Sequence, residues 1–111
     1  MNYAYIGWCR EGTSDKVWGI ILLREHEASH LKFHPFPNYK PAYNEYLSFW
    51  GRRGAKLQTK MFSASIWEAE DMFRKKENKG YVNIPKSRLD EVYPNFQTDL
   101  EKTAMWAMLK I

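Results

Sequence analysis

Residues 46–62, YLSFWGRRGAKLQTKMF, have the pattern of a β-hairpin. Residues 46–52 are mostly aromatic and apolar, which favours a strand, and Arg53 and Gly54 supply a turn. Polar and apolar residues alternate over residues 56–62, which predicts the partner strand. Because successive strand side chains point to opposite faces, this second strand has one basic face and one apolar face. The basic face carries Lys56, Gln58 and Lys60, and the apolar face carries Leu57, Thr59 and Met61.

Two more strands are predicted before this hairpin. Residues 3–8 alternate bulky and small side chains, and residues 17–23 form a β-branched and aromatic run that is too short for a typical buried helix. Residues 10–15, which include Gly12, suit the turn between them. Residues 24–45 are expected to form a long loop, because three prolines there remove backbone donors.

Helical signals follow the hairpin. Ser65 and Glu68 have the spacing of a capping box, which predicts that a helix begins there. Gly80 is the expected stop, after a run of cations that the C-terminal end of the helix dipole favours. Residues 81–84 are predicted to be extended and to end at Pro85.

Two short helical segments are predicted near the end of the sequence. Ser87 is expected to cap a single turn that stops before Pro94. Thr98 and Glu101 have the spacing of a second capping box, which predicts a final helix with Trp106 among its apolar positions.

These elements predict an α+β fold, a small antiparallel sheet crossed by one main helix and followed by a C-terminal helical extension. Residues 1–85 are assigned to the main unit, and residues 86–111 to the extension, packed on it or next to it. A chain of 111 residues, 44% of them hydrophobic, suits a single core. No apolar run approaches the roughly 18 residues of a membrane span, so no membrane partner is expected. Cys9 is the single cysteine and no secretory signal pattern is present, so the expected location is cytoplasmic.

The basic charge is concentrated in the middle of the chain. The formal net charge is +4. Residues 1–49 are neutral, residues 50–88 carry ten basic and four acidic side chains, and residues 89–111 carry two basic and four acidic ones. A basic block of this kind suits a nucleic-acid partner. Residues 74–79 are explained equally well by the helix dipole.

The patterns tested for catalysis and metal binding argue against an enzyme. His26, His30 and His34 have metal-ligand spacing for a helix, but they lie in the proline-rich loop, so neither a metal nor a cofactor is expected. No histidine lies close in sequence to activate Cys9. The acids of residues 68–77 suit ion pairs along a helix, and no glycine-rich phosphate loop occurs.

The motif Trp50-Gly51-Arg52 resembles the Trp-Gly-Arg signature of the WGR domain family. Three further stretches agree in order and spacing with that family. Residues 14–18 resemble the start of its first long strand, residues 60–69 the end of its hairpin and the start of its helix, and residues 79–81 the Lys-Gly-Tyr ending of bacterial members. The chain is similar to a small stand-alone bacterial WGR protein over roughly residues 3–84.

The resemblance implies a sheet crossed by one helix and a role in DNA binding, notably at strand breaks, as in the WGR domains of the DNA-dependent poly(ADP-ribose) polymerases. By matching position, Trp50 would pack on a terminal nucleotide and Arg52 would contact DNA or a neighbouring domain. Lys16 matches a lysine beside the DNA backbone, and Lys60 lies close to a further basic contact.

We therefore expect a non-catalytic nucleic-acid-binding module that contacts DNA backbone or ends through the Trp-Gly-Arg hairpin. Its cations neutralise phosphates and its tryptophan stacks on an exposed base or sugar. The candidate contacts are Lys16, Trp50, Arg52, Arg53, Lys56 and Lys60. Asp15 is expected to oppose binding, because a carboxylate repels a phosphate.

Other interpretations of the same residues stay open. Trp50 could be a packed core residue, and Arg52 could pair with a helix carboxylate. The alternative function is a protein–protein interaction or regulatory module that uses the Tyr- and Pro-rich loop 33–46 or the C-terminal helix, because aromatic side chains are favoured anchors of interfaces.

Overall fold

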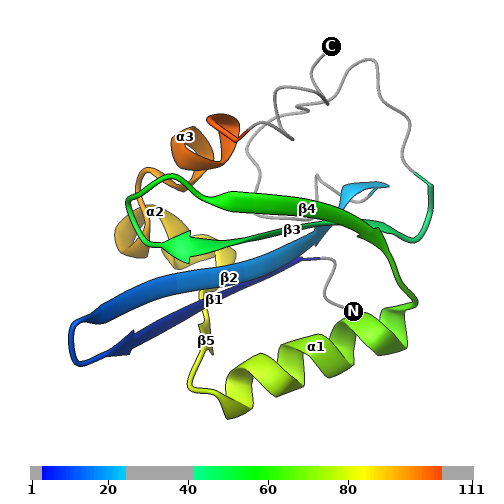
Figure 1. Ribbon diagram of the computed structural model, residues 1–111, viewed down its shortest axis with the longest axis horizontal. Coiled ribbons are helices and arrows are strands. Elements are labelled where there is room, and N and C mark those ends of the chain that lie inside the picture. The colour runs from blue at the N-terminus through cyan, green and yellow to red at the C-terminus, as the bar shows by residue number, and fades with distance from the viewer. Residues whose placement is uncertain (1–3, 25–41, 104–111) are drawn as a thin grey trace.

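The computed structural model describes residues 4–24 and 42–103 (Figure 1). Within these residues, antiparallel strands form one five-stranded sheet in the order β4-β3-β2-β1-β5. The strands are β1 Ala4–Glu11, β2 Ser14–Leu22, β3 Glu45–Arg52, β4 Gln58–Ser63 and β5 Val82–Asn83. The helices are α1 Ile66–Asn78, α2 Leu89–Val92, which follows a 3₁₀ turn at Lys86–Arg88, and α3 Phe96–Glu101. The predicted α+β fold with an antiparallel sheet is confirmed.

The first hairpin is tighter than the sequence predicts. Glu11 pairs with Ser14, so Gly12 and Thr13 alone connect β1 to β2. Gly12 has a φ of 60°, which a glycine adopts without steric cost. The polar residues assigned to a long turn instead extend both strands, because each of them has a pairing partner directly across.

The second hairpin has the predicted alternation. Leu57 is buried and Met61 packs against the same core, whereas Gln58 and Lys60 are exposed on the other face. β4 begins at Gln58, so Lys56 lies in the loop before the strand rather than within it. The face of Gln58 and Lys60 is not polar throughout, because Tyr46, Trp50 and Phe62 on the same side of the hairpin lie in or against a second core.

α1 begins and ends at the predicted residues. Ser65 caps it, because its hydroxyl oxygen accepts a hydrogen bond from the Glu68 backbone N–H at 3.1 Å and its own N–H donates to Glu68 Oε1 at 3.3 Å. The helix ends at Asn78, and Gly80 follows with a φ of 99°, a conformation that favours glycine.

The sheet has helices on both faces, as Figure 1 shows, with α1 along one side and α2 and α3 on the other. The face toward α1 packs through Tyr5, Trp18, Ile20, Leu22, Tyr46, Ala64, Ala69 and Phe73. The opposite face packs through Ile6, Val17, Ile21, Leu23, Leu47, Phe49, Leu57, Ile84, Leu89, Val92, Tyr93, Phe96 and Leu100. The segment after Pro85 thus forms part of the second core layer.

Two capping predictions near the C-terminus are wrong. The residue before α2 is Arg88, not Ser87, and no side chain caps that helix. α3 begins at Phe96, so Thr98 lies inside it, and Asn95 precedes it without a side-chain cap. Packing explains both differences, because the buried side chains of these short helices complete the core. The loop histidines and Trp106 lie outside the described residues.

Candidate nucleic-acid interface

The pairing of strands places Trp50 and Arg52 on the face of the sheet that α1 covers. Trp50 pairs with Trp18 of β2, which belongs to the α1-side core, and Arg52 pairs with Lys16. Paired residues of neighbouring strands project to the same face. Lys60, which pairs with Ser48 in β3, lies on this face as well. Four of the predicted contacts therefore lie on one face of the sheet.

Trp50 separates two surface hollows. The first, which we call the Arg52 hollow, has a volume of about 340 Å³ and is lined by Ser14, Asp15, Lys16, Val17, Trp50, Gly51, Arg52 and Tyr81. The second, which we call the α1 groove, has a volume of about 500 Å³. It lies between α1 and the β3–β4 hairpin and is lined by Trp18, Ser48, Trp50, Lys60, Phe62, Ser63, Ala64, Glu68, Asp71, Met72 and Lys75. Trp50 is partly buried against the α1-side core, so it is neither a fully buried core residue nor a free one.

Cations crowd around two aromatic rings beside the Arg52 hollow. Lys76 Nζ lies 5.1 Å from the centre of the Trp18 ring and 5.6 Å from that of Tyr81, and Lys16 Nζ lies 5.9 Å from the Tyr81 ring. Burial lowers the pKa of Lys76, and the charges of Lys79 and Lys16 lower it further. A site where cations repel one another in this way is favourable for an anion.

The cations of this face are not used in ion pairs within the described ranges. In residues 4–24 and 42–103, no carboxylate forms an ion pair with Lys16, Arg52 or Lys76. The alternative in which Arg52 pairs with a helix carboxylate is thus not observed there. The helix acid Asp71 is engaged by Lys75 at 3.1 Å.

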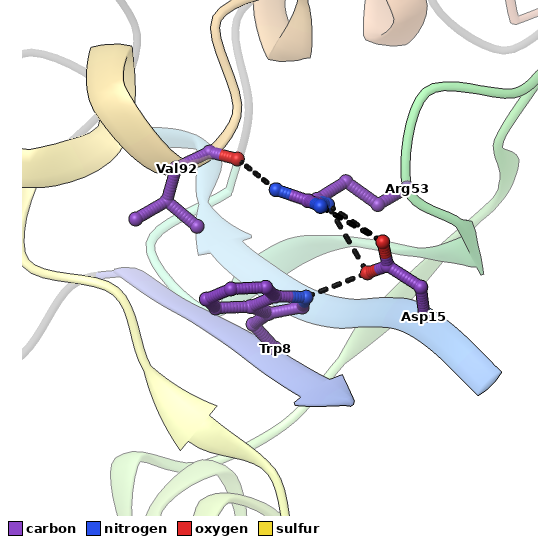
Figure 2. A network of polar contacts seen from close by, with 4 residues as sticks. All are labelled: Trp8, Asp15, Arg53 and Val92. Carbon is purple, nitrogen blue, oxygen red and sulfur yellow. Dashed lines mark hydrogen bonds and ion pairs between the residues drawn. The ribbon is translucent and has the colours of Figure 1, made fainter. Parts of the chain in front are cut away.

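Arg53 has a different environment from its neighbour Arg52. Its guanidinium donates to Asp15 from Nε at 3.1 Å and from Nη2 at 2.8 Å, and it also donates from Nη1 to the carbonyl oxygen of Val92 (Figure 2). The guanidinium carbon lies 4.6 Å from the Trp8 ring centre, and the indole N–H of Trp8 donates to Asp15 Oδ1 at 2.6 Å. We call these four residues the Arg53 cluster. A phosphate contact by Arg53 would require these bonds to be given up.

The Arg53 cluster also changes the expected role of Asp15. Its carboxylate is held by Arg53 and Trp8, and the hydrogen bond from Arg53 is the main cause of its lowered pKa. The backbone N–H of Arg53 also donates to the Asp15 carbonyl oxygen at 3.0 Å. The charge that was expected to repel phosphate is therefore neutralised within the protein.

Gly51 has a structural reason to be glycine. Its φ is 150°, which L side chains rarely adopt, and a Cβ added there would lie 3.3 Å from Leu57 Cδ2. The residue faces the core layer opposite to α1, while its neighbours Trp50 and Arg52 face the α1 side. The motif thus combines a packing position with two surface positions.

Some residues of this face were not predicted from the sequence. Lys75 and Lys76 were attributed to the helix dipole, and Tyr81 was used only as part of the Lys-Gly-Tyr match. The spacing in the sequence could have indicated the position of Lys76. It follows the buried Phe73 by three residues, and residues three apart lie on the same side of a helix, here the side toward the sheet. Lys56, in contrast, is exposed in the loop before β4 and lines neither hollow.

No family model, curated protein or solved structure matches this chain. The functional argument therefore rests on the geometry of the Trp50 face. No group of three or more His, Cys, Asp or Glu side chains in the described part of the chain is arranged to hold a metal. Among the same residues, no helix has the length and apolar character needed to span a membrane.

Proposed function

We propose that this protein is a non-catalytic DNA-binding module that contacts the backbone or ends of DNA with the Trp50 face, defined as Lys16, Trp50, Arg52, Lys60 and Lys76. The observation that carries the proposal is that Lys16 and Arg52 line the hollow on one side of the partly buried Trp50 and Lys60 lines the groove on its other side, none of them in an ion pair with a described carboxylate. The resemblance of the Trp-Gly-Arg hairpin to WGR domains points the same way. Cys9 is a free, buried thiol, which suits a reducing cytoplasmic setting.

The expected chemistry is backbone recognition rather than reading of base edges. Each phosphate neutralised by a lysine or arginine releases counterions, so affinity falls with salt in proportion to the number of contacts. For the four cations of the Trp50 face, the slope of log K against log salt is about −3 to −4. Trp50 adds stacking on a nucleotide that is not covered by a neighbour, which favours nicks and ends over closed duplex.

The test compares binding to closed, nicked and blunt-ended duplex over a salt series. The double variant Lys16→Gln/Arg52→Gln should reduce the salt slope by about 2, since each lost phosphate contact reduces it by about 1. The matched control Arg88→Gln/Lys102→Gln removes the same charge from exposed positions near α2 and α3 and should leave the slope unchanged. Absence of affinity at low salt, or equal losses in both double variants, would refute the proposal.

A second candidate function, protein–protein interaction, is favoured by one specific feature. Tyr43 and Trp67 are 74% and 77% exposed, and both line a hollow of about 520 Å³ at the start of α1. Large exposed aromatic side chains that lie together are typical anchors of interfaces. Tyr43 also belongs to the loop that the sequence suggested for this role.

A pull-down from nuclease-treated lysate separates the two functions. A protein that is retained by the Lys16→Gln/Arg52→Gln variant and lost with Tyr43→Ser/Trp67→Ser would support the second function. If all retained proteins disappear on nuclease treatment, the second function is refuted and the DNA-binding function is favoured.

A further inference from the structure

The α1 groove differs in character from the basic hollow on the other side of Trp50. Its apolar walls come from Trp18, Trp50, Phe62, Ala64 and Met72, and the other six residues that line it are polar or charged. Its volume of about 500 Å³ lies in the range of sites that hold small organic groups, which are commonly apolar with a few polar side chains. A phosphate inside this groove would meet the carboxylates of Glu68 and Asp71 as well as two lysines, whereas a planar base would find an aromatic wall.

We infer that the α1 groove holds an unpaired nucleobase from a single-stranded end or gap, with Trp50 as its stacking wall. The inference rests on the proposed function and deepens it, because it specifies which form of DNA the Trp50 face prefers. A base inside a duplex is covered on both sides by its neighbours and paired along its edge. Only an unpaired base can therefore enter the α1 groove.

The distribution of charge supports an unpaired base as the occupant of the α1 groove. Inside the groove the charges balance, because Lys60 and Lys75 face Glu68 and Asp71. Asp71 is paired with Lys75 at 3.1 Å and Glu68 takes part in the capping box, so the two acids are already engaged. Outside the groove, the Arg52 hollow carries two cations, Lys16 and Arg52, with Asp15 held by Arg53. This arrangement suits a neutral base in the groove and its phosphates in the hollow.

The position of Trp50 links the two sites. Trp50 lines both the α1 groove and the Arg52 hollow. A strand whose phosphate lies at Lys16 and Arg52 therefore has the groove on the other side of the same indole, within reach of its next base. Met72 lies across from Trp50 on α1 and is partly buried, so its flexible thioether can adjust to a bound ring.

The decisive experiment compares three hairpin-capped duplexes that differ at one end. One end is blunt, one carries a short thymidine overhang, and one carries an overhang of the same length made of abasic nucleotides. The abasic overhang has the same phosphates without bases, so it isolates the contribution of the groove. The overhang with bases should bind about tenfold more tightly than the abasic one, which corresponds to the stacking of one base.

A variant that fills the α1 groove tests whether the preference for an overhang with bases arises there. Met72→Trp places a larger ring in the groove without changing charge, and should abolish the preference for the base-bearing overhang over the abasic one. The matched control Ile66→Trp inserts the same ring on the same helix, at a position that does not line the groove, and should keep the preference. Circular dichroism verifies that both variants fold.

Photocrosslinking provides a second measurement that needs no variant. An overhang with 5-iodouracil should crosslink to Trp18, Trp50 or Phe62. Equal affinity of the base-bearing and abasic overhangs, crosslinks exclusively outside the groove, or a folded Met72→Trp variant with the full preference would each overturn the inference. If the inference fails but blunt-end binding still weakens with salt, the proposed DNA-binding function is retained. Absence of binding to all three duplexes would overturn both the inference and the proposed function.

Discussion

Replacement of Arg53 by alanine is expected to destabilise the fold strongly, although Arg53 lies at a surface turn. Its side chain bridges residues that are 38 and 39 positions away in sequence, Asp15 in the first hairpin and Val92 in α2. The side chains of Arg53 and Asp15 are 27% and 23% exposed, so this ion pair is better shielded from water than an ordinary surface pair. Removal of the guanidinium leaves Asp15 with Trp8 as its remaining side-chain donor in the cluster.

The size of the effect follows from the individual contacts. Partly shielded hydrogen bonds between charged groups contribute about 1–2 kcal/mol here, between the values for exposed pairs and for buried charged ones. The bond to the Val92 carbonyl adds about 1 kcal/mol and the Trp8 ring contact about 0.5 kcal/mol. We therefore expect Arg53→Ala to lower the free energy of unfolding by about 3 kcal/mol, a large part of the 5–15 kcal/mol typical of a domain.

The assay is urea unfolding followed by circular dichroism, with Arg74→Ala as the control. Arg74 is 69% exposed and lies 3.8 Å from Asp71, so its loss should cost less than about 0.5 kcal/mol. In a double-mutant cycle, Arg53→Ala and Asp15→Asn should show a coupling of about 1–2 kcal/mol. If Arg53→Ala costs no more than Arg74→Ala, or if the coupling is zero, the stabilising role of the Arg53 cluster is refuted.

Three further predictions concern stability. Arg53 lowers the pKa of Asp15 below its ordinary value of 3.8. The stability that this carboxylate contributes is therefore present above pH 3.8 and is lost as the pH falls through the lower pKa of the folded state. Acid titration should destabilise the wild type more steeply than the Asp15→Asn variant. Gly51→Ala should cost about 1–3 kcal/mol in thermal or urea unfolding because of its φ of 150°, and a change below about 0.5 kcal/mol would contradict that account. The buried hydroxyl of Tyr5 has no hydrogen-bond partner among the described residues, and burial is the main reason that its pKa rises to about 12. Tyr5→Phe should therefore leave stability unchanged or raise it by up to about 1 kcal/mol, whereas a loss above 1 kcal/mol would show that the hydroxyl is satisfied.

Local sequence rules predicted much of residues 1–85, because strand alternation and helix capping depend on residues that are only a few positions apart. The capping box of Ser65 and Glu68 satisfies backbone groups three positions apart, so it could be predicted without knowledge of the fold. The same rule was wrong for Thr98, because Asp99 is buried and accepts a hydrogen bond from the Tyr93 hydroxyl at 2.7 Å. There, the helix begins earlier, at Phe96, and Phe96, Asp99 and Leu100 are buried.

The candidate site was likewise predicted in part by local signals and decided in part by tertiary contacts. The Trp-Gly-Arg motif drew attention to Trp50 and Arg52, and strand alternation placed them on one face. The sequence did not distinguish Arg52 from Arg53, although one is exposed and the other is bound to Asp15 and Val92. It also explained Lys76 by the helix dipole, whereas the structure places it over two aromatic rings.

The sequence by itself determined the strands, the main helix and the basic centre of the chain, because periodicity, capping and charge are properties of neighbouring residues. Tertiary structure alone decided that α2 and α3 complete the second core layer and that Asp15 is neutralised by Arg53. It also decided that Trp50 separates a basic hollow from an apolar groove. Each of these features depends on residues that meet only after the strands have paired and both faces of the sheet have been covered.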